Sequence, residues 1–143
     1  MKVRQVSIFL ENRSGRIAKI STALGNANIN IRAMSLADTS DFGILRLVVT
    51  DTEKAVEILK DHGFTVRVTH VIAAVIPDIP GALGNLLSMM ERAGLNVEYM
   101  YAFIQKSMDE AILIFRFDDL DKALDTLLEN DITILDENTV LGL

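Results

Sequence analysis

The first seventy residues switch between two hydrophobic periods. Residues 3–10 show the alternation of a half-buried strand, and residues 17–27 carry apolar side chains at helical spacing. The period of two returns in residues 29–37 and 43–50, with a turn at residues 39–42 between them, which predicts a hairpin. The pattern therefore predicts a strand, a helix and two further strands, in this order.

A second helix and a fourth strand complete this pattern. Apolar residues recur at helical spacing between Ala55 and Leu59, either Asp51 or Thr52 can cap the helix, and His62-Gly63 is a typical helix end. Residues 64–68 then alternate again and predict the last strand. The order β-α-β-β-α-β is the split arrangement of ferredoxin-like α+β domains.

The second half of the chain repeats the first. Matching positions lie 66 residues apart at the start of the repeat and 68 apart after a two-residue insertion. The matched polar and glycine positions include Asn12 with Asp78, Gly15 with Gly81, Asn30 with Asn96, and Asp51 with Asp119. We therefore expect two tandem ferredoxin-like βαββαβ domains, residues 1–69 and 70–143.

The repeat also predicts the elements of the second domain. Its strands are expected at residues 71–76, 95–105, 111–117 and 132–135, and its helices at residues 81–93 and 119–129. The last strand of the first domain leads almost directly into the first strand of the second, so no flexible linker separates them. Each four-stranded sheet leaves edges and one bare face, and we expect the two sheets to associate.

The composition and the charge indicate a globular protein and argue against a nucleic-acid-binding one. Half of the 143 residues are apolar, which is enough for a core, and the net charge of −6 argues against a nucleic-acid partner. The acidity and the missing aromatic pattern also disfavour an RNA-recognition module of similar topology. The charge is uneven, because the first twenty residues hold five bases and a single acid, Glu11. We expect a positive field around the first strand-to-helix junction.

The expected cellular location rests on two absences in the sequence, cysteine and a long apolar run. There is no cysteine, and the longest apolar run, residues 71–76, is far shorter than the roughly 20 residues that span a bilayer. We therefore expect a cytoplasmic protein with no membrane partner.

The strand-to-helix junction, residues 12–15, is the most informative stretch, and we call it the first corner; residues 78–81 form the second corner. Helix-opening N–H groups lack partners within the helix and favour a carboxylate, and glycine lets a ligand approach. Asn12 and Asp78 offer oxygens to an ammonium group, and Asn30 and Asn96 are expected beside these corners. Together these groups suit a free amino acid.

Helix capping is the alternative for the same residues. Asn12 or Ser14 is a competent cap, and Pro80 suits a first helical position. Caps alone do not require an asparagine fifteen residues after the glycine in both halves. The joint pattern therefore favours a ligand site over simple capping.

The stretch ENRSGRIAKISTALGNANINI, residues 11–31, resembles the opening of an ACT domain, a small-molecule regulatory module of enzymes of amino-acid metabolism. Its corner is similar to that of the serine-sensing domain of phosphoglycerate dehydrogenase, with Ser14 in place of proline. The resemblance implies two tandem ACT domains, and we expect a homodimer. It also implies that the corner asparagine and the asparagine before the second strand bind an amino acid between two domains.

The resemblance carries the ligand site onto both halves of the chain. Leu10 and Ile76 stand where that relative has a ligand-binding histidine, so serine is not the expected ligand. Asp78 changes the charge of the second corner, so the two sites are not equivalent. The candidate amino-acid-binding residues are Leu10, Asn12, Arg13, Ser14, Gly15, Arg16, Asn30, Ile31, Ile76, Asp78, Ile79, Pro80, Gly81, Ala82, Asn96 and Val97.

We expect no catalysis, no metal and no cofactor. The serines lack a convincing base, and two histidines leave little acid–base chemistry to arrange. The leading hypothesis is a non-catalytic, allosteric amino-acid sensor that modulates a partner. The alternative is a dedicated regulatory subunit of an amino-acid biosynthetic enzyme, since residues 12–30 also resemble the small subunit of acetolactate synthase. Tyr99 and Tyr101 share one strand face and are expected to serve packing rather than the ligand.

Overall fold

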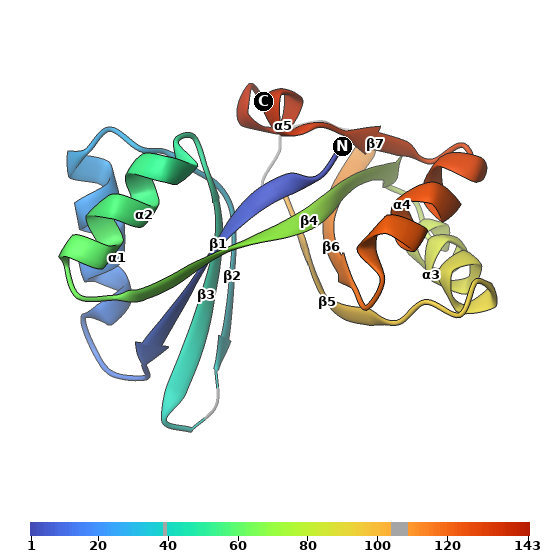
Figure 1. Ribbon diagram of the computed structural model, residues 1–143. Coiled ribbons are helices and arrows are strands. Elements are labelled where there is room, and N and C mark those ends of the chain that lie inside the picture. The colour runs from blue at the N-terminus through green and yellow to red at the C-terminus, as the bar shows by residue number, and fades with distance from the viewer. Residues whose placement is uncertain (39, 104–108) are drawn as a thin grey trace. The chain divides into compact units, whose positions relative to one another are not determined.

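The computed structural model describes residues 1–38, 40–103 and 109–143. The chain forms two compact units (Figure 1). The first unit is Arg4–Thr69, and the second unit is His70–Leu143 together with Met1–Val3.

The first unit has the predicted order of elements, which confirms the ferredoxin-like arrangement. Its strands run in the order β2-β3-β1-β4, and β3 is antiparallel to both β1 and β2. The elements are β1 (Val3–Glu11), α1 (Arg16–Asn26), β2 (Ile31–Asp38), β3 (Phe42–Val49), α2 (Thr52–Asp61) and β4 (Thr65–Pro77).

The second unit repeats this topology with the end of β4 as its first strand. Its strands lie in the order β7-β4-β6-β5, and the three pairings are antiparallel. The elements are α3 (Ala82–Arg92), β5 (Val97–Ala102), β6 (Glu110–Phe117), α4 (Leu120–Glu129), β7 (Thr133–Leu135) and α5 (Glu137–Leu141).

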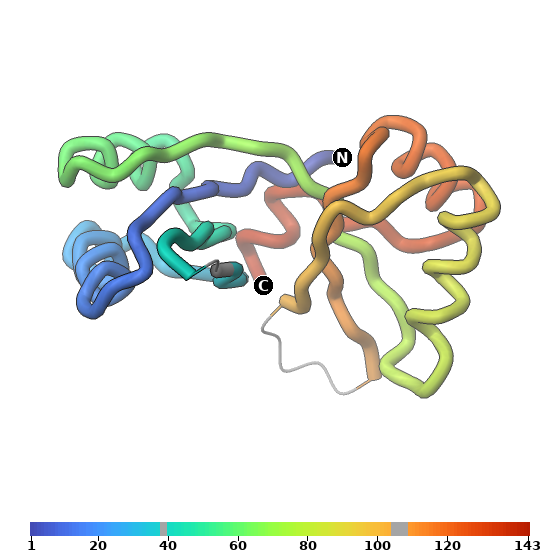
Figure 2. The backbone as a smooth tube through the Cα atoms, turned by 90° about the horizontal axis from the view of Figure 1, so that it is seen from below, coloured from blue at the N-terminus to red at the C-terminus, as the bar shows by residue number. Residues whose placement is uncertain are grey.

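Each unit has its own core between its sheet and its two longer helices, which lie on one side of the strands (Figure 2). In the first unit Ile20 and Leu24 of α1 and Leu59 of α2 are fully buried. In the second unit Leu86 of α3 and Leu127 of α4 take the same places. Burying side chains of this size contributes about 1.5–3 kcal/mol each.

The strand β4 extends through 13 residues and belongs to both units. The two strands expected at residues 64–68 and 71–76 are therefore one element. Thr69 and His70, which join them, include no glycine or proline that would break an extended chain.

Several smaller features differ from the sequence-based expectation. The helix α5 was not predicted; Asp136 caps it by accepting a hydrogen bond from the Thr139 N–H at 2.8 Å. Thr39 of the expected turn and residues 104 and 105 of the expected strand lie outside the described residues. Tyr99 and Tyr101 pair with Arg116 and Ile114 on one sheet face, which confirms their shared side.

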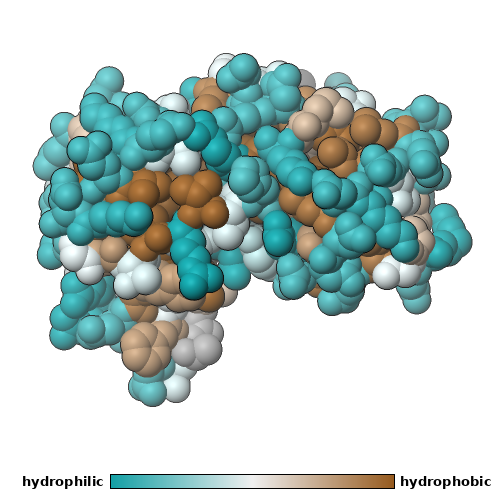
Figure 3. Space-filling model, in the orientation of Figure 1, coloured by the Kyte–Doolittle hydropathy of each residue, from teal (hydrophilic) through white to brown (hydrophobic). Residues whose placement is uncertain are grey.

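The face of the molecule drawn in Figure 3 is largely polar. Hydrophilic side chains cover most of the face drawn in Figure 3, with apolar areas between them. Among the described helices, none is long and apolar enough to cross a membrane.

Candidate functional site

The two corners have the same backbone geometry. Gly15 and Gly81 precede α1 and α3 with φ values of 87° and 88°, in the left-handed region that favours glycine. No side chain of the described residues caps either helix start. The alternative interpretation, in which Asn12 or Ser14 caps α1 and Pro80 opens α3, is therefore not supported, because no described side chain caps either helix and α3 begins at Ala82.

The other long helices begin differently. Asp51 accepts a hydrogen bond from the Lys54 N–H at 3.1 Å and caps α2, and Asp119 accepts one from the Lys122 N–H at 3.0 Å and caps α4. Of the two caps predicted for α2, Asp51 is correct. In each unit the helix after the corner is therefore the one whose start lacks a side-chain cap.

The corners are fixed to the loop between the second and third strands of their own unit. The Asn12 N–H donates to the carbonyl of Asp41 at 2.9 Å, and the Asp78 N–H donates to the carbonyl of Asp109 at 3.0 Å. The side-chain nitrogen of Asn12 also donates to the Ser40 carbonyl at 3.5 Å. This contact uses the amide nitrogen of Asn12, whereas the expected ligand contact uses its oxygen.

Asn30 and Asn96 are exposed, and each lies at the end of its sheet opposite to the corner of the same unit. The Asn30 N–H donates to Thr50 Oγ1 at 3.0 Å, and the Asn96 N–H donates to Asp118 Oδ1 at 3.0 Å. These bonds use the backbone of each asparagine.

The strand register separates the two halves of the predicted site within one unit. The end of β1 pairs Glu11 with Phe42, whereas the start of β2 pairs Ile31 with Val49, seven residues further along β3. At about 3.4 Å per residue this is roughly 20–25 Å. The expectation that Asn30 lies beside the corner of its own unit is wrong, and the register of β4, β5 and β6 gives the same result for Asn96.

The structure therefore divides the candidate residues of each unit into two groups. One group gathers at the corner end of the sheet and the other at the opposite end. The corner groups are Leu10, Asn12, Arg13, Ser14, Gly15 and Arg16 in the first unit, and Ile76, Asp78, Ile79, Pro80, Gly81 and Ala82 in the second; the opposite groups are Asn30 with Ile31, and Asn96 with Val97.

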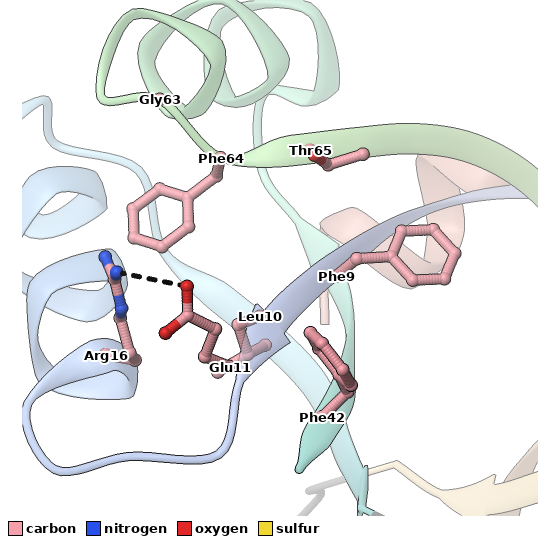
Figure 4. Close-up of a pocket in the computed structure, with 8 residues that line it drawn as sticks. All are labelled: Phe9, Leu10, Glu11, Arg16, Phe42, Gly63, Phe64 and Thr65. Atoms are coloured by element: carbon pink, nitrogen blue, oxygen red, sulfur yellow. Dashed lines mark ion pairs between the residues drawn. The ribbon is translucent and has the colours of Figure 1, made fainter.

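A cavity of about 240 Å³ lies beside the first corner (Figure 4). It is formed by the end of β1, the starts of α1, β3 and β4, and the loop that precedes β4. Its lining residues are Phe9, Leu10, Glu11, Arg16, Phe42, Gly63, Phe64 and Thr65. Of these, only Leu10 and Arg16 were sequence-based candidates.

Two opposite charges face this cavity. Oε1 of Glu11 lies 3.9 Å from Nη2 of Arg16, and Oε2 of Glu11 lies 3.2 Å from Nε of Arg13. The Arg16 guanidinium carbon is 6.0 Å from the centre of the Phe64 ring, a cation–π distance. Figure 4 shows the Phe64 ring, Arg16 and Glu11 directed toward one another. Glu11 was visible in the sequence as the single acid among the early bases, whereas no local pattern connects Phe64 to the corner.

The second unit has a cavity in the equivalent place, with a volume of about 370 Å³. Its lining residues are Val75, Ile76, Pro77, Asp109, Glu110, Asp131, Ile132 and Thr133. Three of these side chains are acidic and none is basic. In the described part of the chain, this cavity included, no group of three or more His, Cys, Asp or Glu residues is placed to hold a metal ion.

Known proteins share this architecture. A crystal structure of a protein from Bacteroides thetaiotaomicron is 38% identical, with a TM-score of 0.93, and the match covers 100% of this chain and 98% of that chain. The ligand-free regulatory subunit of aspartate kinase from Thermus thermophilus is 15% identical, with a TM-score of 0.66 and coverage of 88% and 91%. The corresponding subunit from Thermus flavus is 17% identical, with a TM-score of 0.62 and coverage of 88% and 90%.

No curated protein matches the chain in sequence. The family model described as an ACT domain pair matches residues 1–143, the whole of the chain. The duplicated fold, the paired glycine corners and this match agree, and the chain belongs to the ACT domain pair family.

Proposed function

We propose that this protein is a non-catalytic regulatory module that binds a free amino acid at its corners. The observation that carries the proposal is the difference between the helix starts of each unit. Asp51 and Asp119 cap α2 and α4, whereas α1 and α3 begin at left-handed glycines without a side-chain cap. Uncapped N–H groups at a helix start attract an anion such as a carboxylate.

The ligand would bridge two ACT modules. Its carboxylate would accept hydrogen bonds from the amides at the start of α1, and its ammonium group would donate to the side-chain oxygen of Asn12. Asn30 lies too far from this corner within its own unit, so the second asparagine would come from a second copy of the chain. A bridging ligand of this kind stabilises one arrangement of modules over others, which is the requirement for a regulatory signal.

The regulated partner in this proposal is an enzyme of amino-acid metabolism. Support comes from the regulatory subunits of aspartate kinase, which share the fold at TM-scores of 0.66 and 0.62. The partner changes activity only if it contacts the liganded and free arrangements differently.

Thermal unfolding against the twenty amino acids tests the proposal. An amino acid present at 100 times its Kd should add about 2.7 kcal/mol of stability, or on the order of 5–10 °C in Tm. Asn12→Ala and Asn30→Ala should each abolish that shift. Asn26→Ala is the matched control, because Asn26 is exposed at the opposite end of α1.

Two results would count against the proposal. One is an unchanged Tm across the whole panel for protein that carries no copurified ligand. The other is a shift that survives unaltered in folded Asn12→Ala and Asn30→Ala variants.

A further inference from the structure

Arg16 and Glu11 line the cavity beside the first corner, and their contact does not use all of their hydrogen-bonding groups. Charged N–H···O hydrogen bonds are typically about 2.7–2.9 Å long, whereas the closest approach of Glu11 and Arg16 is 3.9 Å. A guanidinium has five N–H donors, and a carboxylate has about four lone-pair positions. Both side chains therefore keep hydrogen-bonding capacity toward the cavity.

The surroundings of the two charges differ. The Arg16 side chain is 26% exposed and lies near the ring of Phe64, which is itself buried. The Glu11 side chain is 53% exposed. Coulomb interactions strengthen where water is excluded, so a carboxylate gains most from the more shielded Arg16, and an ammonium group can reach Glu11 from the open side.

We propose that this cavity is a binding site for a small zwitterion, with the ligand carboxylate on Arg16 and its ammonium group on Glu11. The ligand class rests on the proposed function, but the contacting side chains differ from the corner amides and Asn12. Leu10 and Phe64 supply apolar contacts for the ligand carbon atoms. The volume of about 240 Å³ is below the roughly 300–1,000 Å³ of sites for drug-sized molecules, which favours a metabolite the size of an amino acid.

The equivalent cavity of the second unit lacks this charge pair. The repeat places Pro77 at the position of Glu11 and Ala82 at the position of Arg16. Ile132 takes the place of Phe64, and Asp131 that of Gly63. A carboxylate there would face Asp109, Glu110 and Asp131 without a lining cation. The proposal therefore predicts one charge-paired site in each chain, in the first unit.

Titration calorimetry on the full chain tests this site. The probes are the twenty amino acids and, for each one that binds, the matching 2-oxo acid, which keeps the carboxylate and lacks the ammonium group. Wild-type protein should bind one amino acid per chain at this site and should bind the 2-oxo acid at least tenfold more weakly. Arg16→Gln should weaken both probes at least tenfold, because it removes a charge-assisted hydrogen bond. Glu11→Gln should chiefly reduce the preference for the amino acid.

Lys60→Gln is the matched control, because it removes an exposed cation from α2 of the same unit that does not line the cavity. It should change both Kd values less than threefold, and circular dichroism should show that all variants are folded. If Arg16→Gln and Glu11→Gln bind with the wild-type Kd while Asn12→Ala does not bind, this inference is wrong and the proposed function stands. If the wild-type protein binds none of the amino acids, both are wrong.

Discussion

Two glycines three residues apart, Gly81 and Gly84, have opposite roles although both are exposed. Gly81 holds a φ of 88°, whereas Gly84 lies within the helix α3. A Cβ built on either residue meets nothing within 4 Å. Any difference between alanine substitutions at the two positions therefore comes from the backbone and not from a steric clash.

Alanine substitution of these glycines should change stability in opposite directions. Gly81→Ala should lower the free energy of unfolding by about 1–2 kcal/mol, because a side chain disfavours left-handed backbone. Gly84→Ala should raise it by about 0.5–1 kcal/mol, because alanine is the better helix former. Urea unfolding monitored by circular dichroism measures both. Equal stabilities of the two variants would contradict the backbone geometry of the corner.

Single residues predict some features of the candidate site from the sequence, but not others. The glycine corners and their repetition were predicted from local sequence. A glycine just before a helix is by itself a sign of left-handed backbone at that position. The placement of Asn30 beside Asn12 was wrong, because it depends on strand direction: β1 and β2 both run antiparallel to β3, so the end of one and the start of the other lie at opposite ends of the sheet. Phe64 reaches the cavity from the loop that precedes β4, more than fifty residues along the chain from Glu11, and no local pattern predicts this contact.

At the scale of elements, the four long helices differ in how they begin. The helices α2 and α4 start at aspartate caps in extended backbone, whereas α1 and α3 start at glycine. The periodicity of the sequence predicted all four, because apolar residues at helical spacing must face the core. It did not predict α5, whose five residues are too few to show a period.

Loss of the α4 cap should destabilise the second unit. Asp119→Ala removes the hydrogen bond to the Lys122 N–H and should lower the free energy of unfolding by about 1 kcal/mol. Asp125→Ala is the matched control, because it removes an exposed aspartate from the middle of the same helix and should change the value by less than about 0.5 kcal/mol. Chemical denaturation compares the two variants, and equal losses would show that the cap contributes no specific stabilisation.

At the scale of the whole molecule, an ion pair among the described residues of each unit lowers a carboxyl pKa. A hydrogen bond from Arg4 lowers the pKa of Glu53 in the first unit, and a hydrogen bond from Lys2 at 2.6 Å lowers the pKa of Asp121 in the second. A carboxyl group with a lowered pKa in the folded state stabilises the protein above its unfolded pKa, about 3.9–4.3 for these residues. This stabilisation is lost as the pH falls through the folded value.

Acidification should therefore reduce the contribution of both pairs. The double variant Glu53→Gln and Asp121→Asn should be slightly less stable than wild type at pH 7, and the difference should shrink at pH 3, because protonation of these carboxyl groups in the unfolded chain removes the stabilisation below their unfolded pKa. The effect should be small and should decline with salt, because both carboxyl groups are exposed. Urea midpoints at the two pH values measure it, with Glu57→Gln on α2 as the control. A difference that grows at pH 3 would have the wrong sign for these pairs.

Duplication explains both what is shared and what differs between the halves. The repeated hydrophobic pattern specifies the same core twice, so the fold follows from the sequence in both units. The cavity linings are freer to change, because neither charge of the Glu11–Arg16 pair belongs to a core. Equivalent positions therefore carry an ion pair in one unit and Pro77 and Ala82 in the other.

The strands β1 and β4 each contribute residues to both units: the buried Val3 at the start of β1 belongs to the second unit, and β4 passes from one unit into the other. A fragment cut between Thr69 and His70 would divide β4, and the C-terminal fragment would also lose Val3 and the Lys2 partner of Asp121. Neither half can therefore be treated as a separable domain. Grafting the second unit onto another protein would require the three N-terminal residues as well.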